Sequence, residues 1–373
     1  MIEQRNIKII KGEITLFIVT YFIYTLKSII ISLEIDEDYI TIVSSVSNSI
    51  IITMVCLGFL LFDNKKKILI AFTSILFVIN LLIYNNPVYF GYLVLMHLLM
   101  LSNGMPWKNV ISILFFVNVL VIVVCVPLLF LADSHYMIDD RTGQRLTLGF
   151  HNPNTLSQYA LTLFSIIVLW GREHIKSVSI ETLNLVIAFS VLLLVTYMSG
   201  SRTSILLSII LLCGYLMSFT LRKQYKKRSW FVLSYFSVAL VIAFLQFYYS
   251  SIYITSDLAK LLNELLSSRI WYSYLLITEM SYPAIFHSIN IDIYMPIDFF
   301  FLSYFYNLGW LPGLVFIFIY YNKMKEQTFT FAMCVALWGA LAISLSENYY
   351  TIAIYNVGLF ATFSQRFYTG IRK

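Results

Sequence analysis

The feature that most constrains this chain is a series of apolar windows of about 20 residues, separated by short polar segments. A helix of about this length crosses a hydrocarbon core of about 30 Å and satisfies its own backbone hydrogen bonds. The windows cover residues 12–32, 40–62, 68–84, 88–103, 110–132, 154–170, 177–198, 203–221, 229–250, 298–321, 328–345 and 348–365. A soluble globular chain is excluded, since 60% of the 373 residues are apolar. We predict an all-α polytopic membrane protein with about twelve transmembrane helices in a single integral membrane domain, 1–373.

The charged residues orient these windows. Placing the N-terminal segment "RNIKIIK" inside puts "DNKKK", "RKQYKKR" and "RFYTGIRK" on the same side, as the positive-inside rule requires. Both termini are then cytoplasmic. Thirteen of the 19 acidic residues fall outside, whereas only five of the 25 basic residues do. These five are Arg141, Arg145, Arg202, Lys260 and Arg269.

Arginine is therefore over-represented on the acidic outer face. Its guanidinium is a planar fork that binds phosphate or carboxylate through two bonds and stays charged when desolvated. Four outer arginines indicate an anionic ligand. Pairing with outer acids such as Asp139 and Asp140 is the alternative explanation for any one of them.

Two outer loops are long, 133–153 and 251–297. In the second, Ser256 can cap a helix and Asp257 suits its first turn. Leucines follow at helical spacing, at positions 258, 261, 262, 265 and 266. We predict an amphipathic helix on the outer leaflet, with Arg269 at the edge of its apolar face.

Three further outer residues lie where the sequence predicts helix starts. Gly200 permits a turn that leaves Arg202 beside the N-terminus of the eighth helix, where exposed N–H groups favour an anion. An arginine snorkelling to the interface is the alternative. His151 and Asn154 flank Pro153, and each can contact a phosphate or only help to start the sixth helix.

Carboxylates at a membrane edge are costly unless they are paired or functional. Asp298 opens the tenth window and Glu347 lies between the last two. Either can accept a proton from a sugar hydroxyl or hold an arginine in place. No metal-ligand spacing, phosphate-binding glycine loop or serine-triad motif occurs, so we expect no metal and no cofactor.

Several of these residues occur in short motifs that resemble the bacterial O-antigen ligase and Wzy-type polysaccharide polymerase superfamily. The motifs are "RLTLGFHNPNTLSQYA" (145–160), "SGSRTSILLSIILL" (199–212), "LLSSRIWY" (265–272), "DFFFLSYFYNLGW" (298–310) and "SENYYT" (346–351). The resemblance covers the chain from about residue 140 to its end, and the order and sidedness of the motifs carry it.

The resemblance implies a GT-C-like, metal-independent inverting glycosyltransferase in the bacterial cell membrane, with its active site on the extracytoplasmic side. Arg202 and Arg269 would bind the pyrophosphate of an undecaprenyl-linked glycan, with Arg141, Arg145, His151 and Asn154 in the same site. Expected partners are undecaprenyl-pyrophosphate-linked oligosaccharides, membrane lipid, and flippase and chain-length regulator proteins. No nucleic-acid partner is expected.

Two departures from the family pattern bear on the base that deprotonates the acceptor. Asp298 stands where ligases tend to have histidine, which favours a polymerase, and His287 lies where relatives are often glycine-rich. Asp298, Glu347 and His287 are the candidate bases. A ligase that moves glycan to a different acceptor is an alternative, and a polysaccharide or lipid transporter or flippase is one from another class.

Overall fold

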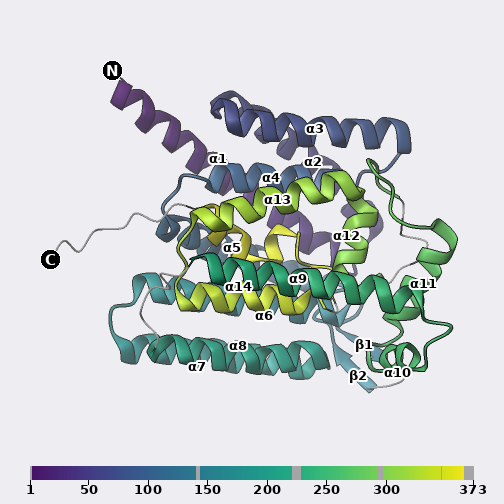
Figure 1. The fold of residues 1–373 in the computed structure, drawn as a ribbon. Helices are drawn as coiled ribbons and strands as arrows, with labels where there is room; N and C mark the ends of the chain where they lie inside the picture. Colours follow the sequence, from purple (N-terminus) through teal and green to yellow (C-terminus); the bar gives the residue numbers. More distant parts are fainter. Residues whose placement is uncertain are drawn as a thin grey trace.

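The computed structural model describes residues 2–139, 143–220, 228–289, 291, 294, 297–345 and 347–364. Long helices run side by side along the bundle, and α1 begins at one end of it (Figure 1). The elements are α1 (Ile2–Ile31), α2 (Glu37–Leu61), α3 (Asn64–Tyr84), α4 (Tyr89–Ser102), α5 (Trp107–Leu129), β1 (Tyr136–Asp139), β2 (Gly143–Leu146), α6 (Pro153–His174), α7 (Val178–Met198), α8 (Arg202–Thr220), α9 (Arg228–Ser251), α10 (Asp257–Leu265), α11 (Arg269–Met280), α12 (Phe300–Leu308), α13 (Trp310–Glu326), α14 (Phe331–Ile343), the 3-10 turn η2 (Ala353–Tyr355) and α15 (Val357–Phe363).

Burial separates an inner from an outer set of helices. Every residue of α15 is buried, as is almost all of α4, and α15 packs on α4, α13 and α14. In contrast, α2, α3 and α7 bury few of their residues although they are strongly apolar. Apolar helices exposed in this way suit a lipid environment, in which the hydrocarbon covers their outer faces.

The membrane prediction is confirmed in its general form. Among the described residues, seven helices are long and apolar enough to cross a membrane, or up to eight if one bent pair forms a single span. That pair is α12 and α13, which meet at 117°. The prediction of one continuous helix over 298–321 is therefore wrong, because the chain turns at Gly309, whose φ of +80° favours glycine.

The last predicted window also differs from the structure. Among its described residues, 348–364, only Val357–Phe363 forms an α-helix, preceded by η2 and irregular backbone. The short lengths of α4 and α14 further distinguish the structure from twelve uniform spans. Hydropathy detects that these segments are buried, but it does not distinguish burial in protein from burial in lipid.

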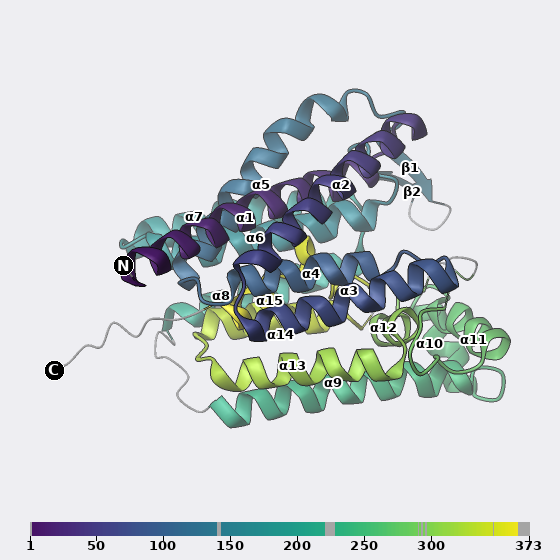
Figure 2. The ribbon, with the colours of Figure 1, turned by 90° about the horizontal axis from the view of Figure 1, so that it is seen from above.

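The end of the bundle opposite the start of α1 carries β1, β2, α10, α11 and α12 (Figures 1 and 2). α10 forms where the sequence predicted the amphipathic helix, with the Ser256 side chain accepting from the Ala259 N–H at 3.2 Å. It ends at Leu265, so the placement of Arg269 on this helix is wrong, and Arg269 begins α11 instead. The loop after α5 contains an antiparallel hairpin that pairs Met137 with Arg145. The helix that follows, α6, is capped by Asn152, two residues before Asn154, which the sequence suggested as its start.

Candidate functional site

An arginine and two carboxylates from three separate segments meet at this end of the bundle. The Nε of Arg269 donates to Oδ2 of Asp298 at 2.8 Å, and its Nη2 donates to Oε1 of Glu347 at 2.7 Å. The side chains of Arg269 and Glu347 are each 10% exposed, and that of Asp298 is 25% exposed. We call these three residues the ion cluster. The structure thus shows both carboxylates holding an arginine, one of the two roles that the sequence left open.

The corner between α10 and α11 presents Arg269 to the cluster. Ser267 and Ser268 adopt left-handed backbone with φ of 54° and 68°, which turns the chain sharply. Asn263 of α10 caps the N-terminus of α11, because its Oδ1 accepts a hydrogen bond from the Trp271 N–H at 2.8 Å. The backbone carbonyl of Asn263 accepts from the Ser268 N–H. Arg269 is therefore held in the first turn of α11, with its side chain pointing into protein.

The two carboxylates sit at helix ends. Asp298 precedes α12 by two residues, and Glu347 follows α14, with its N–H bonded to the carbonyl of Ile343 at 2.9 Å. Next to Glu347, the Asn348 amide donates to Oγ of Ser303 in α12 at 2.7 Å. The ends of α12 and α14 are thus joined beside the cluster.

Glu347 lies outside the spanning helices and is strongly perturbed. Burial raises its pKa from 4.5 to about 7, and the nearby Asp298 carboxylate adds to the rise. The guanidinium groups of Arg269 and Arg145 oppose it. Burial, together with the charge of Glu347, also raises the pKa of the neighbouring Tyr349. Glu347 can therefore exchange a proton near neutral pH, as a general base must.

Arg145 is positioned beside the cluster by contacts with two helices. Its Nε donates to the carbonyl of Ser199 at 2.7 Å, and its Nη2 donates to Oδ1 of Asn154 at 2.9 Å. Gly200 makes room for it, since a Cβ there would lie 3.2 Å from the Arg145 Nε. The structure thus brings together Arg145 and Asn154, which the sequence assigned to one site.

Arg202 is the first residue of α8 and is exposed. Within the described part of the chain, its guanidinium makes no ion pair and no hydrogen bond. The expected turn at Gly200 is present, with φ of +63°. Arg202 is therefore available to a ligand, three residues after Ser199, whose carbonyl binds Arg145.

The two candidate histidines have no hydrogen bond to the ion cluster. His151 is exposed, and only its backbone is engaged, with its N–H donating to the carbonyl of Ser32 at 2.9 Å. The His287 ring stacks on Tyr84 at the end of α3, with centroids 4.1 Å apart. Its Nδ1 lies 3.0 Å from the carbonyl oxygen of its neighbour, Ser288. Arg141 lies outside the described residues.

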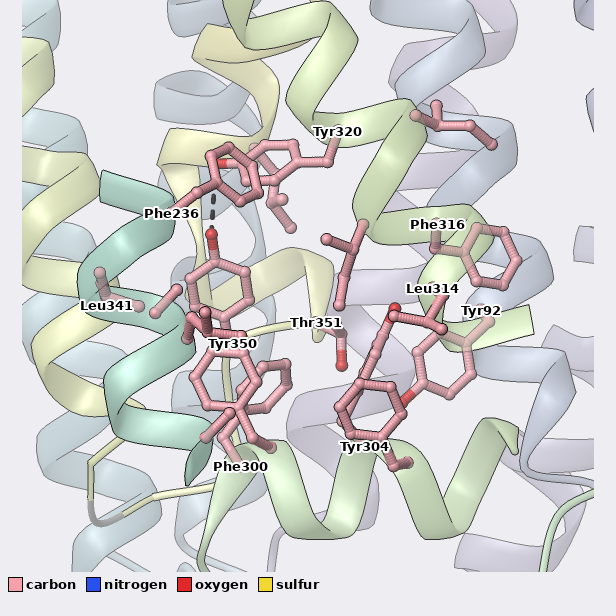
Figure 3. A pocket seen from close by; sticks show the side chains of 18 of the residues that line it. Tyr92, Phe236, Phe300, Tyr304, Leu314, Phe316, Tyr320, Leu341, Tyr350 and Thr351 are labelled. Carbon is pink, nitrogen blue, oxygen red and sulfur yellow. Dashed lines mark hydrogen bonds between the residues drawn. The ribbon is translucent and has the colours of Figure 1, made fainter. Parts of the chain in front are cut away.

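An apolar cavity of about 630 Å³ adjoins the segments that carry the two carboxylates (Figure 3). Phe300 and Phe301 line it two and three residues after Asp298, and Tyr350 lines it three residues after Glu347. The other walls come from α4, α9, α13, α14 and α15. Two exposed residues of α9, Leu240 and Phe244, also line it, so the cavity reaches the side of the bundle.

Tyrosine hydroxyls supply polar groups in this otherwise apolar cavity. The hydroxyl of Tyr350 pairs with that of Tyr235 and donates to that of Tyr320 at 3.2 Å. These contacts tie the irregular segment after Glu347 to α9 and α13. The three hydroxyl groups thus satisfy one another's hydrogen-bonding capacity, as buried hydroxyls require.

Sequence reasoning missed Gln246, whose side chain links the ends of α12 and α14. The sequence did contain a signal for this residue: a lone amide in the apolar run "LVIAFLQFYY" is costly in a membrane unless both its oxygen and its nitrogen are hydrogen-bonded.

Across the described ranges, no group of three His, Cys, Asp or Glu side chains could hold a metal ion. Comparison of the chain with protein-family models, curated proteins and solved structures gave no match.

Proposed function

We propose that this protein is a polysaccharide polymerase of the bacterial cell membrane. It transfers a glycan from undecaprenyl pyrophosphate to the non-reducing end of a second lipid-linked repeat unit, on the outer face. The observation that carries this proposal is the arginine–carboxylate cluster beside an apolar cavity that reaches the side of the bundle. A substrate with an anionic head and a long hydrocarbon chain matches both features.

The charged side chains have distinct roles in this reaction. Arg202 offers an unengaged guanidinium to the pyrophosphate, and Arg269 and Arg145 add positive charge beside it. Glu347 accepts the proton of the acceptor hydroxyl, whose oxygen forms a bond to the anomeric carbon. The bond from that carbon to the pyrophosphate oxygen breaks, and the leaving group keeps the electron pair. The expected outcome is inversion at the anomeric carbon.

Positioning supplies much of the rate enhancement. The glycosyl–pyrophosphate bond already stores the energy for transfer, so the protein must align donor and acceptor and stabilise the leaving charge. Alignment can contribute roughly 7–11 kcal/mol, and fixed cations in a site that excludes water contribute several more. Residues anchored by several hydrogen bonds, such as Arg145 and Arg269, are suited to this task.

The cavity fits the hydrocarbon chain of the donor. Its walls are almost entirely apolar, and burial of each methylene stabilises a bound chain by about 0.8 kcal/mol. Access from the side would let the chain enter from the bilayer while the pyrophosphate stays at the level of the head groups. Ala243→Trp, which fills the cavity, should raise the KM for the lipid-linked donor. Val241→Trp on the exposed side of α9 is the matched control.

Turnover of the purified protein with a synthetic undecaprenyl-pyrophosphate oligosaccharide, without nucleotide, tests the proposal. A ladder of products indicates a polymerase, whereas one transfer to a different acceptor indicates a ligase. Arg202→Gln and Arg269→Lys should each lower turnover by at least about 10²-fold with normal membrane levels. Lys260→Gln removes another cation at this end and should leave turnover unchanged. Wild-type ladders from both arginine variants would refute the assigned roles.

A lipid or polysaccharide transporter is the second candidate, and one observation favours it. Transporters build substrate sites from broken helices, and α12 and α13 meet at 117° beside a cavity. Proteoliposomes that move a labelled lipid-linked oligosaccharide across the bilayer without elongating it would identify a transporter.

A further inference from the structure

Gln246 of α9 makes two hydrogen bonds that span the candidate site. It is 4% exposed. Its Oε1 accepts the N–H of Phe301 at 2.9 Å, and its Nε2 donates to the carbonyl of Ser344 at 2.8 Å. The side chain thus joins α12 to α14, two helices with no direct sequence connection.

Each bond satisfies a helix end that lacks an internal partner. Phe301 lies in the first turn of α12, where N–H groups have no carbonyl one turn earlier, and Phe299 provides no side-chain cap. Ser344 is the C-cap of α14, where the carbonyl groups are unpaired in the same way. Leaving either group unbonded in a buried place costs about 1–3 kcal/mol, so both bonds define the local geometry.

The bonded groups are equally spaced from the two carboxylates. Phe301 follows Asp298 by three residues, and Ser344 precedes Glu347 by three residues. Arg269 bonds both carboxylates from the other side, through Nε and Nη2. A single amide therefore sets where the two carboxylates stand relative to each other and to the guanidinium between them.

We propose that Gln246 is a positioning residue that fixes the spacing of Asp298 and Glu347 across Arg269. It touches neither substrate nor any reacting atom. The bond from Asn348 to Ser303 is a second connection between the same helices. That bond comes from the residue after Glu347, and it engages neither the N–H of Phe301 nor the carbonyl of Ser344. The kinetic consequence rests on the proposed function, whereas the geometric one does not.

The test compares Gln246→Met, which keeps the shape and removes both bonds, with Gln246→Asn, whose shorter side chain reaches only one helix end. Ser250→Ala is the control, since its buried Oγ one turn along α9 has no partner in the described part of the chain. The readout is the infrared titration of Glu347 in purified protein, assigned by the band that Glu347→Gln removes.

We expect the Glu347 titration to move by at least one pH unit in Gln246→Met, by less in Gln246→Asn, and not in Ser250→Ala. In turnover of the lipid-linked oligosaccharide, kcat should fall by about 10²-fold in Gln246→Met, with KM within about threefold. Folded Met and Asn variants with the wild-type titration would overturn the inference. If Gln246→Met does not accumulate, Gln246→Asn alone decides it. A wild type that titrates as described but elongates no glycan would refute the proposed function and leave the positioning role standing.

Discussion

Glu347 makes the stability of this protein depend on pH in a direction opposite to that of most carboxylates. In the folded state its pKa is about 7, whereas 4.5 is the ordinary value in an unfolded chain. The folded state therefore binds this proton more tightly. Between these two values the unfolded chain loses the proton while the folded protein keeps it, so the free energy of unfolding falls as the pH rises.

The size of the effect follows from the two values. Each pH unit of difference corresponds to about 1.4 kcal/mol, so the rise from 4.5 to about 7 amounts to about 3 kcal/mol. The contribution is fully present below pH 4.5 and is lost once the pH has passed about 7. The side chain is only 10% exposed, so solvent screens little of this effect.

Glu347→Gln should remove this dependence, because glutamine does not titrate. The assay is the free energy of unfolding of purified protein in detergent, measured from pH 4.5 to pH 8. The difference between wild type and Glu347→Gln should change by about 3 kcal/mol over that range. Glu264→Gln, an exposed carboxylate of α10 at the same end, should match the wild type. If Glu347→Gln keeps the wild-type slope, the burial argument for Glu347 is refuted.

The same titration predicts how turnover depends on pH. As a base, Glu347 must be ionised, so kcat should rise with pH and level off above about 7. Besides burial, the charges of Arg269, Asp298 and Arg145 influence the pKa of Glu347. Burial and the charge of Glu347 in turn raise the pKa of Tyr349. Asp298→Asn removes a negative neighbour, so it should shift the rise to lower pH. A pH profile that Asp298→Asn leaves unchanged would show that Glu347 is not the group that titrates.

Three further predictions concern backbone and neighbouring side chains. Gly309→Ala should destabilise the protein by at least about 1 kcal/mol in chemical denaturation. The φ of Gly309 is +80°, and a Cβ there would lie 3.0 Å from two carbonyl oxygens. Gly91→Ala, where a Cβ would meet no atom within 4 Å, should be neutral. Gly200→Ala should reduce turnover by displacing Arg145, and retention of full turnover would show that Arg145 is not needed in its observed position. His287→Phe should keep both its stack on α3 and normal turnover in the oligosaccharide assay, and a large loss would restore His287 as a candidate base.

Much of the fold follows from local sequence because lipid and buried protein impose the same rule. Backbone groups that water cannot reach must be bonded within their own helix, so apolar windows predict helices well. The cap at Ser256 and the turn at Gly200 were predictable for a similar reason, since each depends on a side chain or a φ angle at one position.

The irregular segment after α14 was not predictable because distant residues satisfy its backbone. The carbonyl of Tyr355, for example, accepts from Oγ1 of Thr162 in α6, 193 residues earlier in the chain. Apolar residues make up most of this segment, so the sequence suggested a span, although its asparagines and tyrosines lower its mean hydropathy below that of the spanning helices. For the site, charge and sidedness identified Arg269, Asp298 and Glu347, but their mutual bonds required the fold.

The departures from regular helix lie toward one end of the molecule. Among the described residues, five residues other than glycine have positive φ, and they are Asn85, Leu148, Ser267, Ser268 and Ser281. They follow α3, β2, α10 and α11, at the end of the bundle that carries the ion cluster (Figure 1). Backbone of this kind costs of order 1–3 kcal/mol per residue and persists only where the surroundings fix it. Most of these residues directly follow a helix, where left-handed backbone ends the helix and lets its last carbonyls find partners, as Asn85 does at the C-terminus of α3.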